Sequence, residues 1–417
     1  MDAQPSSGPR HSPPPHHNTR LIRPTTRPAG LDTQTTVLAE GTTGRPDTFG
    51  SRDLRLDFFR GLALLFIFID HIPFNMMAWL TIHNYGFSDA AEVFIFISGY
   101  SAAIAYGRVL RRGGFWAAVT RVLRRCWELY IAHVVLLILF TGLIAIIMWG
   151  SDNDFFAEQM QVIHFFQNPL QIIGQALLLK YRPAFFDILP LYIVMLLDLP
   201  VLLWIMDRWP PAAFAIAATV YVVVQVTHVN LPAYPPGLKW NFNPLAWQFL
   251  FFLGAFIAWR YNRPGPVVPR RPALLALAGA ILVFAAVQSL LLLLREPDTL
   301  PAWLTALPTR KTDLDPLRIL HFFALAYLTV SVIGERPAFL RRPIAYPVIC
   351  CGQRSLPVFC AGILLSLAAH MVLVMVRGNL AMQVVVSLTG IALLLAIGTG
   401  LCWISAHAKA EVRSTGK

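Results

Sequence analysis

The chain has 417 residues, of which 56% are hydrophobic and only 13% are charged, and its formal net charge is +12 at pH 7. Soluble domains carry about 25% charged residues, and a single soluble core of this size is larger than such domains build. The composition therefore excludes an ordinary soluble protein. The basic residues lie in short loops between apolar runs, the membrane pattern, so we reject a nucleic-acid-binding surface.

Residues 1–50 are rich in Pro, Thr, Arg and His and have no apolar periodicity. Such a segment cannot bury enough apolar surface to offset the chain entropy lost on folding. It also lacks the apolar core and the small-residue cleavage site of a signal peptide. We therefore predict a disordered cytoplasmic tail.

About ten apolar runs of membrane-spanning length, roughly 20 residues each, follow within residues 51–408. They are 56–79, 88–107, 127–149, 186–206, 211–228, 244–260, 272–294, 317–334, 355–376 and 381–406. These runs predict an all-α polytopic membrane protein. The stretch 161–182 is less apolar, and we expect a re-entrant or interfacial helix there, although an eleventh span is also compatible with its length.

The basic residues predict the orientation of the spans. Most of the 34 lysines and arginines lie in the tail and in the loops 108–125, 208, 260–271, 336–354 and 409–417. Cytoplasmic loops carry such an excess, and basic loops here alternate with non-basic ones. We expect both termini, including a short C-terminal tail at 409–417, in the cytoplasm.

Charged residues inside a span are costly and often functional, and the first span contains several. Arg60 and His71 are eleven residues apart, about three helical turns, so they share a face and lie about 16 Å apart along the axis. Asp57 precedes Arg60 by three residues and is expected to pair with it. Asp70 adjoins His71 but points about 100° away.

His71 is the residue best suited to acid–base chemistry, because imidazole titrates near neutrality and can take a proton from a hydroxyl group. Glu92 begins the antiparallel second span at a comparable depth, so we expect it to orient His71. The alternatives are a structural role for His71 and an interface salt bridge for Glu92. Gly99 lies on the face of Glu92 and would allow the close approach of another helix or of a ligand.

An arginine-rich segment follows the second span. Arg121, Arg124 and Arg125 share one helical face on the predicted cytoplasmic side. Planar guanidinium groups suit phosphate oxygens, so these residues are predicted to bind a phosphate-bearing ligand. The alternative is that these positive charges only orient the chain in the membrane and bind anionic lipid.

The five cysteines form no C-x-x-C pair, and four lie in or beside apolar runs. They indicate small buried hydrophobic side chains rather than a disulfide framework or a zinc site. We expect no metal site.

Several short motifs resemble the membrane acyltransferase-3 superfamily, and within it the OpgC-like branch. The first-helix arginine and histidine, the Asp57-x-x-Arg60-Gly61 start, Ser98-Gly99-Tyr100 and the R-x-x-R of Arg121 and Arg124 match the wider superfamily. Closer to the OpgC-like branch are Asp187-Ile-Leu-Pro190-Leu-Tyr192, Asn243-Pro-Leu-Ala-Trp247-Gln248 and Ser355-Leu-Pro357-Val-Phe359. After the R-x-x-R motif the chain departs from the pattern that many superfamily members share. We therefore do not assign the substrate specificity of the wider superfamily to this chain.

The resemblance implies an O-acyltransferase of the bacterial inner membrane that transfers succinyl from cytoplasmic succinyl-CoA to osmoregulated periplasmic glucans. Acyl-CoA would be a co-substrate, with no bound cofactor. His71, Glu92, Asp70 and Arg60 would form the catalytic group. Acceptor contacts are expected from residues at the outer ends of two spans, namely Asp187, Tyr192, Asn243, Trp247 and Gln248; helix capping and an aromatic belt are the alternative for these residues.

Two further points stay open at this level. A succinyl carboxylate would need a cationic partner inside the membrane, and Arg60 and Arg318 are the candidates. A glycan or anion transporter, with Arg60, His71 and Glu92 lining its path, is the alternative function.

Overall fold

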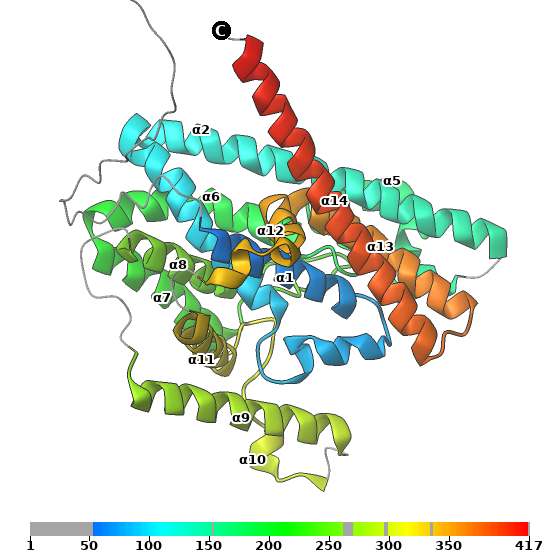
Figure 1. The fold of residues 1–417 in the computed structure, drawn as a ribbon. Coiled ribbons are helices and arrows are strands. Elements are labelled where there is room, and N and C mark those ends of the chain that lie inside the picture. Colours follow the sequence, from blue (N-terminus) through cyan, green and yellow to red (C-terminus); the bar gives the residue numbers. More distant parts are fainter. Residues whose placement is uncertain (1–52, 152–153, 262–269, 296–298, 334–336, 416–417) are drawn as a thin grey trace, which may run out of the picture. The chain divides into compact units, whose positions relative to one another are not determined.

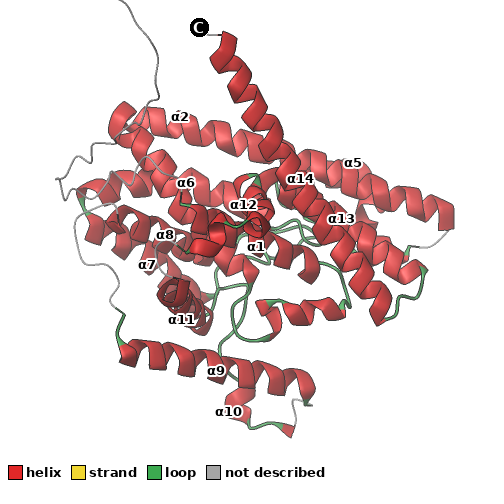
Figure 2. Ribbon diagram, in the orientation of Figure 1, coloured by secondary structure: helices red, strands yellow, loops and turns green. Residues whose placement is uncertain are grey.

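The structure is a computed structural model that describes residues 53–151, 154–261, 270–295, 299–333 and 337–415. The predicted tail at 1–50 lies outside these residues. Within them the regular elements are helices, joined by loops that contain two isolated β-bridges (Figure 2). An all-α architecture therefore agrees with the apolar periodicity of the sequence.

Each predicted apolar run contains helix (Figure 1), but the first run, predicted over 56–79, is helical only as far as Asp70, before the chain turns into the short helix η1 (Met76–Leu80). Seven of the described helices are long and apolar enough to cross a membrane. They are α2 (Ala90–Ser151), α6 (Ile188–Arg208), α7 (Pro210–Thr227), α9 (Pro272–Leu294), α11 (Pro316–Ile333), α13 (Ser355–Met375) and α14 (Leu380–Thr415). The shorter helices α1 (Leu54–Asp70) and α8 (Pro244–Tyr261) carry two more of the predicted runs. The count of ten spans and the side of the termini stay predictions.

Helix α2 contains both the second and the third predicted spans. Its backbone leaves the helical conformation at Gly114, where φ is 79° and ψ is −179°. Side chains with a Cβ rarely adopt this region, so glycine permits the chain to kink between the two spans. The kink lies in the arginine-rich segment that the sequence places between them.

The stretch 155–177 forms three short helices, α3 (Phe155–Gln159), α4 (Ile163–Gln167) and α5 (Pro169–Leu177). The longest has nine residues, whereas a span needs about 20. An eleventh span across 161–182 is therefore ruled out for this structure, and the interfacial or re-entrant interpretation remains. At the other end of the chain, α14 continues through Thr415, into the predicted C-terminal tail.

The helices that carry the site pack closely through glycine. Helix α1 packs against α12 (Tyr346–Gln353), α13 and α2, and α2 packs against α8 and α6. A Cβ on Gly99 of α2 would collide with the Phe251 carbonyl oxygen of α8, so this position needs glycine. The close helix approach expected at Gly99 is thus confirmed. Helix α9 packs mainly on α11, and its outward face is exposed.

Candidate functional site

His71 lies at the C-terminal end of α1 and caps the helix, its backbone N–H donating to the Ile67 carbonyl oxygen at 3.0 Å. The preceding residue, Asp70, accepts a hydrogen bond of 2.7 Å from Thr81 Oγ1. Thr81 also accepts a bond of 3.3 Å from the backbone N–H of His83. The end of α1 is thereby tied to the short helix η2 (Ile82–Asn84), which starts just after Thr81.

The His71 ring stacks on Phe185, with centroids 4.3 Å apart and planes 26° from parallel. Its Nδ1 is buried and has no hydrogen-bond partner among the described residues. A buried ring nitrogen without a partner is costly, and such groups are often completed by a ligand or water. The Nδ1 atom of His71 is therefore a buried ring nitrogen that no described protein group satisfies.

Phe185 belongs to a loop whose conformation is held by a buried ion pair. Arg182 Nε lies 2.8 Å from Asp187 Oδ1, and their side chains are only 3% and 8% exposed. The Arg182 guanidinium also lies 4.0 Å from the centre of the Trp240 ring. Between the paired residues, Phe185 adopts φ of +73°, a region that costs a non-glycine residue about 1–3 kcal/mol.

Four charged side chains near the start of α2 form what we call the charge cluster, namely Asp89, Glu92, Lys311 and Arg318. Arg318 Nη2 lies 2.6 Å from Glu92 Oε1 and 3.4 Å from Asp89 Oδ2. Lys311 Nζ lies 2.5 Å from the same Asp89 oxygen. Two positive and two negative groups are therefore joined into one network. Glu92 is fully buried and Arg318 nearly so, and buried charges of this kind need their partners.

The charge cluster corrects the predicted role of Glu92. Its Oε1 accepts from Arg318 Nε at 2.7 Å, and its Oε2 accepts from the backbone N–H of Asp89 at 2.8 Å. Both carboxylate oxygens are therefore occupied by groups other than His71. The alternative for Glu92, a salt bridge between helices, is what the structure shows, because α11 brings Arg318 to the start of α2.

Two more histidines adjoin the charge cluster. His83 Nδ1 lies 3.7 Å from Asp89 Oδ2, and about half of the His83 side chain is exposed. The Asp89 carboxylate raises the pKa of His83 above its usual value, and burial opposes the shift. His321 Nδ1 lies 2.7 Å from Ser88 Oγ and is buried. Sequence reasoning missed both, because neither stands at a spacing that marks a partner.

The predicted acceptor residues are engaged inside the protein. Trp247 is fully buried, and its Nε1 donates to the Lys311 and Thr312 carbonyl oxygens at 3.0 and 3.2 Å. Asn243 donates to Asp313 Oδ1 at 3.0 Å, and Gln248 donates to the Ala217 carbonyl oxygen at 2.9 Å. Because Trp247 is fully buried, it cannot stack on a sugar. Its hydrogen bonds instead hold the loop that places Lys311 beside Asp89.

The other two predicted acceptor residues, Asp187 and Tyr192, have different partners within the protein. Asp187 accepts from Arg182 and, through Oδ2, from Asn241 Nδ2 at 3.1 Å. It precedes α6 without a side-chain cap hydrogen bond. Tyr192, one turn further along α6, packs edge-on against Phe251 at 6.1 Å. Asp187 thus supports the Phe185 loop.

Arg60 lies towards the opposite end of α1 from His71. Its Nη1 is 3.8 Å from Asp57 Oδ1, in agreement with the spacing of three residues. Its Nη2 donates to the Ser101 hydroxyl and, at 3.2 Å, to the Ile97 carbonyl oxygen. Arg60 therefore ties α1 to α2 and does not adjoin the charge cluster.

The arginine segment of α2 is largely solvent- or lipid-accessible. Arg121 and Arg124 are exposed. Arg125 is partly buried and forms a 2.8 Å ion pair with Glu128. The first two guanidinium groups are accessible to an anionic ligand, whereas Arg125 already has a carboxylate partner.

The cysteines are unpaired thiols. Cys126, Cys350 and Cys351 are buried, and the other two, Cys360 and Cys402, are partly buried. Their locations agree with small apolar side chains in helix contacts.

Fold and site together define the class: a multi-pass, all-helical membrane protein with a buried network of charges beside a histidine that ends its first long helix. The family profile described as "OpgC protein" matches residues 52–406, almost all of the described chain. The chain belongs to the OpgC family. This membership indicates an acyltransferase of the OpgC type, which modifies glucans. No curated protein and no solved structure matches the chain significantly.

Proposed function

We propose that this protein is an O-acyltransferase of the bacterial inner membrane that transfers succinyl from cytoplasmic succinyl-CoA to hydroxyl groups of osmoregulated periplasmic glucans. The observation that carries the proposal is the match to the OpgC family over residues 52–406. The buried His71 nitrogen without a protein partner and the neighbouring charge cluster support it. No comparable observation favours a transporter.

In the proposed reaction, a glucan hydroxyl oxygen attacks the thioester carbonyl carbon of succinyl-CoA. The hydroxyl proton passes to His71, because the acidity of a sugar hydroxyl is far too low at pH 7. The carbon–sulfur bond then breaks, and the coenzyme A thiolate leaves and regains a proton from the imidazolium. The products are a succinyl ester of the glucan and free coenzyme A, so no oxidant or reductant is needed.

Phe185 supports this role by constraining the His71 ring. A ring stacked at 4.3 Å cannot rotate freely about its side-chain bonds, and pre-orientation of a base lowers the entropic part of the barrier. Asp70 is occupied by Thr81. We assign Asp70 to the support of the α1 end rather than to proton transfer.

The donor is proposed to bind on the side of Arg121 and Arg124, where the two exposed guanidinium groups would bind phosphate oxygens of coenzyme A. The acceptor would arrive at the end of α1 that carries His71. In this proposal the pantetheine arm of the donor extends along the bundle from Arg121 and Arg124 to His71.

Two measurements test the proposal. Mass spectrometry of periplasmic glucans from cells with and without the protein should show succinyl esters only in the former. The detergent-purified protein should transfer succinyl from succinyl-CoA to glucan with no compartments present. Purified, folded protein that neither transfers succinyl nor hydrolyses succinyl-CoA would contradict the proposal and favour the transporter.

A further inference from the structure

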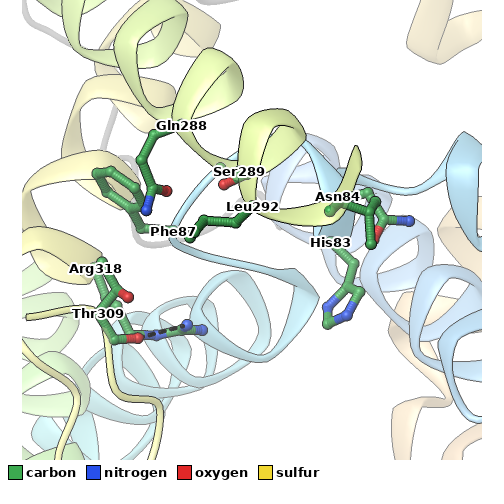
Figure 3. Close-up of a pocket in the computed structure, with 10 residues that line it drawn as sticks. His83, Asn84, Phe87, Gln288, Ser289, Leu292, Thr309 and Arg318 are labelled. Carbon is green, nitrogen blue, oxygen red and sulfur yellow. Dashed lines mark hydrogen bonds between the residues drawn. The ribbon is translucent and has the colours of Figure 1, made fainter. Parts of the chain in front are cut away.

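A cavity of about 280 Å³ lies between η2, the end of α9 and the start of α11 (Figure 3). Its wall combines polar side chains, among them the charged Arg318 and the Asp89-paired His83, with apolar ones. The lining residues on which the argument rests are His83, Asn84, Phe87, Gln288, Ser289 and Arg318. This volume is near the lower end of ligand pockets, about 300–1,000 Å³, so it suits one small unit of a ligand.

The charges beside the cavity disfavour an anionic ligand. Arg318 is the cation in its wall, and that guanidinium is bound by Glu92 at 2.6 Å and by Asp89 at 3.4 Å. Because Lys311 also binds Asp89, the two cations of the charge cluster are matched by two carboxylates. A ligand carboxylate would compete with these carboxylates for Arg318. The expectation that Arg318 binds a succinyl carboxylate is therefore not supported by its contacts.

The remaining lining suits hydroxyl groups. Amides and a hydroxyl both donate and accept hydrogen bonds, and a protonated imidazole donates, so a sugar hydroxyl, which does both, can pair with each. Gln288 is notable because it is only 3% exposed and lies on a helix whose outward face is apolar. Its Nε2 donates to the Leu304 carbonyl oxygen at 3.2 Å. A polar side chain in such a helix is costly and usually functional.

Hydrogen bonds connect the cavity to Asp70, the residue that precedes His71. The backbone N–H of His83, in the cavity wall, donates to Thr81 Oγ1 at 3.3 Å, and that hydroxyl donates to Asp70 at 2.7 Å. Asp70 directly precedes His71. A ligand in the cavity would therefore rest on the same segment that positions the proposed base.

We propose that this cavity is the acceptor subsite and binds one neutral pyranose unit of the glucan. The inference rests on the proposed function for the identity of the acceptor. The neutral, hydroxyl-bearing class of ligand follows from the pairing of Arg318 and His83 with carboxylates and from the amide and hydroxyl groups of the wall.

The first test fills the cavity from α9. In Ser289→Trp the indole occupies space that the sugar would use, so the KM for glucan should rise about tenfold or more. The KM for succinyl-CoA and the rate of succinyl-CoA hydrolysis without acceptor should stay at wild-type values. Val287→Trp is the matched control, since Val287 lies on the same helix, is exposed and does not line the cavity.

The second test needs no catalysis and a milder change. In Ser289→Cys, glucan should slow labelling of the new thiol by a maleimide, measured above the wild-type background. Sodium succinate at the same concentration should not slow it. Val287→Cys should label equally with and without glucan.

The outcomes separate the two proposals. If the wild type transfers no succinyl but glucan still protects Ser289→Cys, the proposed function fails and the subsite stands. If the wild type transfers succinyl, yet Ser289→Trp keeps its KM for glucan and glucan gives no protection, the subsite is overturned. Protection by succinate rather than by glucan would also overturn it, and would assign the cavity to the donor.

Discussion

Phe185 and His71 lie ring against ring, with centroids 4.3 Å apart, although 114 residues separate them in the chain. The Phe185 backbone is in the left-handed region, with φ of +73°. The Arg182–Asp187 ion pair holds the surrounding loop. Phe185 keeps this strained conformation beside the proposed base, which indicates that the position of the Phe185 ring matters to the site.

Replacing Phe185 by Ala should lower kcat for acyl transfer. Loss of an aromatic contact of about 0.5–1.5 kcal/mol corresponds to roughly twofold to tenfold. Phe185→Tyr keeps the ring and should retain most of the activity. Steady-state kinetics with both substrates measure this, and wild-type kcat in the Ala variant would show that the stack does not position His71.

His71→Ala should abolish measurable transfer, because general-base catalysis contributes about 10²–10⁴ in rate. His71→Gln keeps hydrogen bonding without basicity and should be equally inactive. Both variants should still bind donor, which isothermal titration with a non-hydrolysable succinyl-CoA analogue measures. Near-normal transfer by His71→Gln would make His71 structural and would turn attention to Asp70.

Arg121→Ala with Arg124→Ala should raise the KM for succinyl-CoA. Each lost charge-assisted contact costs about 1.5–3 kcal/mol, so a rise of tenfold or more is expected. The control is Arg270→Ala with Arg271→Ala, which removes the same charge from another predicted cytoplasmic loop. If the two double variants have equal effects, Arg121 and Arg124 do not bind the donor and only help to orient the chain in the membrane.

Breaking the Arg318–Glu92 pair should destabilise the fold strongly. Removing one partner of a buried pair typically costs about 3–5 kcal/mol, because the other charge is left buried. Arg318→Gln should therefore unfold at much lower temperature than Arg318→Gln combined with Glu92→Gln. The more exposed Arg125–Glu128 pair is the control, and Arg125→Ala should cost less than about 1 kcal/mol. Equal melting temperatures for wild type and Arg318→Gln would contradict the pairing.

His83 should make stability depend on pH. Its folded pKa is raised by Asp89, assisted by Asp70 and opposed by burial and by Lys311. The stabilisation is therefore complete below the unfolded pKa of about 6.5 and is lost as pH rises through the higher folded pKa. The melting temperature of wild type relative to His83→Gln should fall as pH increases across this window. A constant difference would show that protonated His83 does not stabilise the fold.

The sequence alone determined the features that depend on local spacing. Apolar runs of about 20 residues predict helices because backbone groups in lipid must bond within their own segment. The i, i+3 spacing placed Asp57 beside Arg60, and Gly99 marked a close helix contact because glycine has no Cβ to obstruct it. The chemistry of imidazole singled out His71, but its role as a base stays a prediction, and the structure places it at the cap of α1 rather than within the helix.

Only the tertiary structure decided which distant residues meet. Glu92 and Arg318 are far apart in the chain, and their pairing depends on how α11 packs beside α2, which no local periodicity encodes. The same holds for Phe185 on His71 and for the loop that carries Lys311 past Trp247 to Asp89. A carboxylate can pair equally well with an imidazole or a guanidinium, so residue type left the partner of Glu92 open, and helix packing selected the arginine.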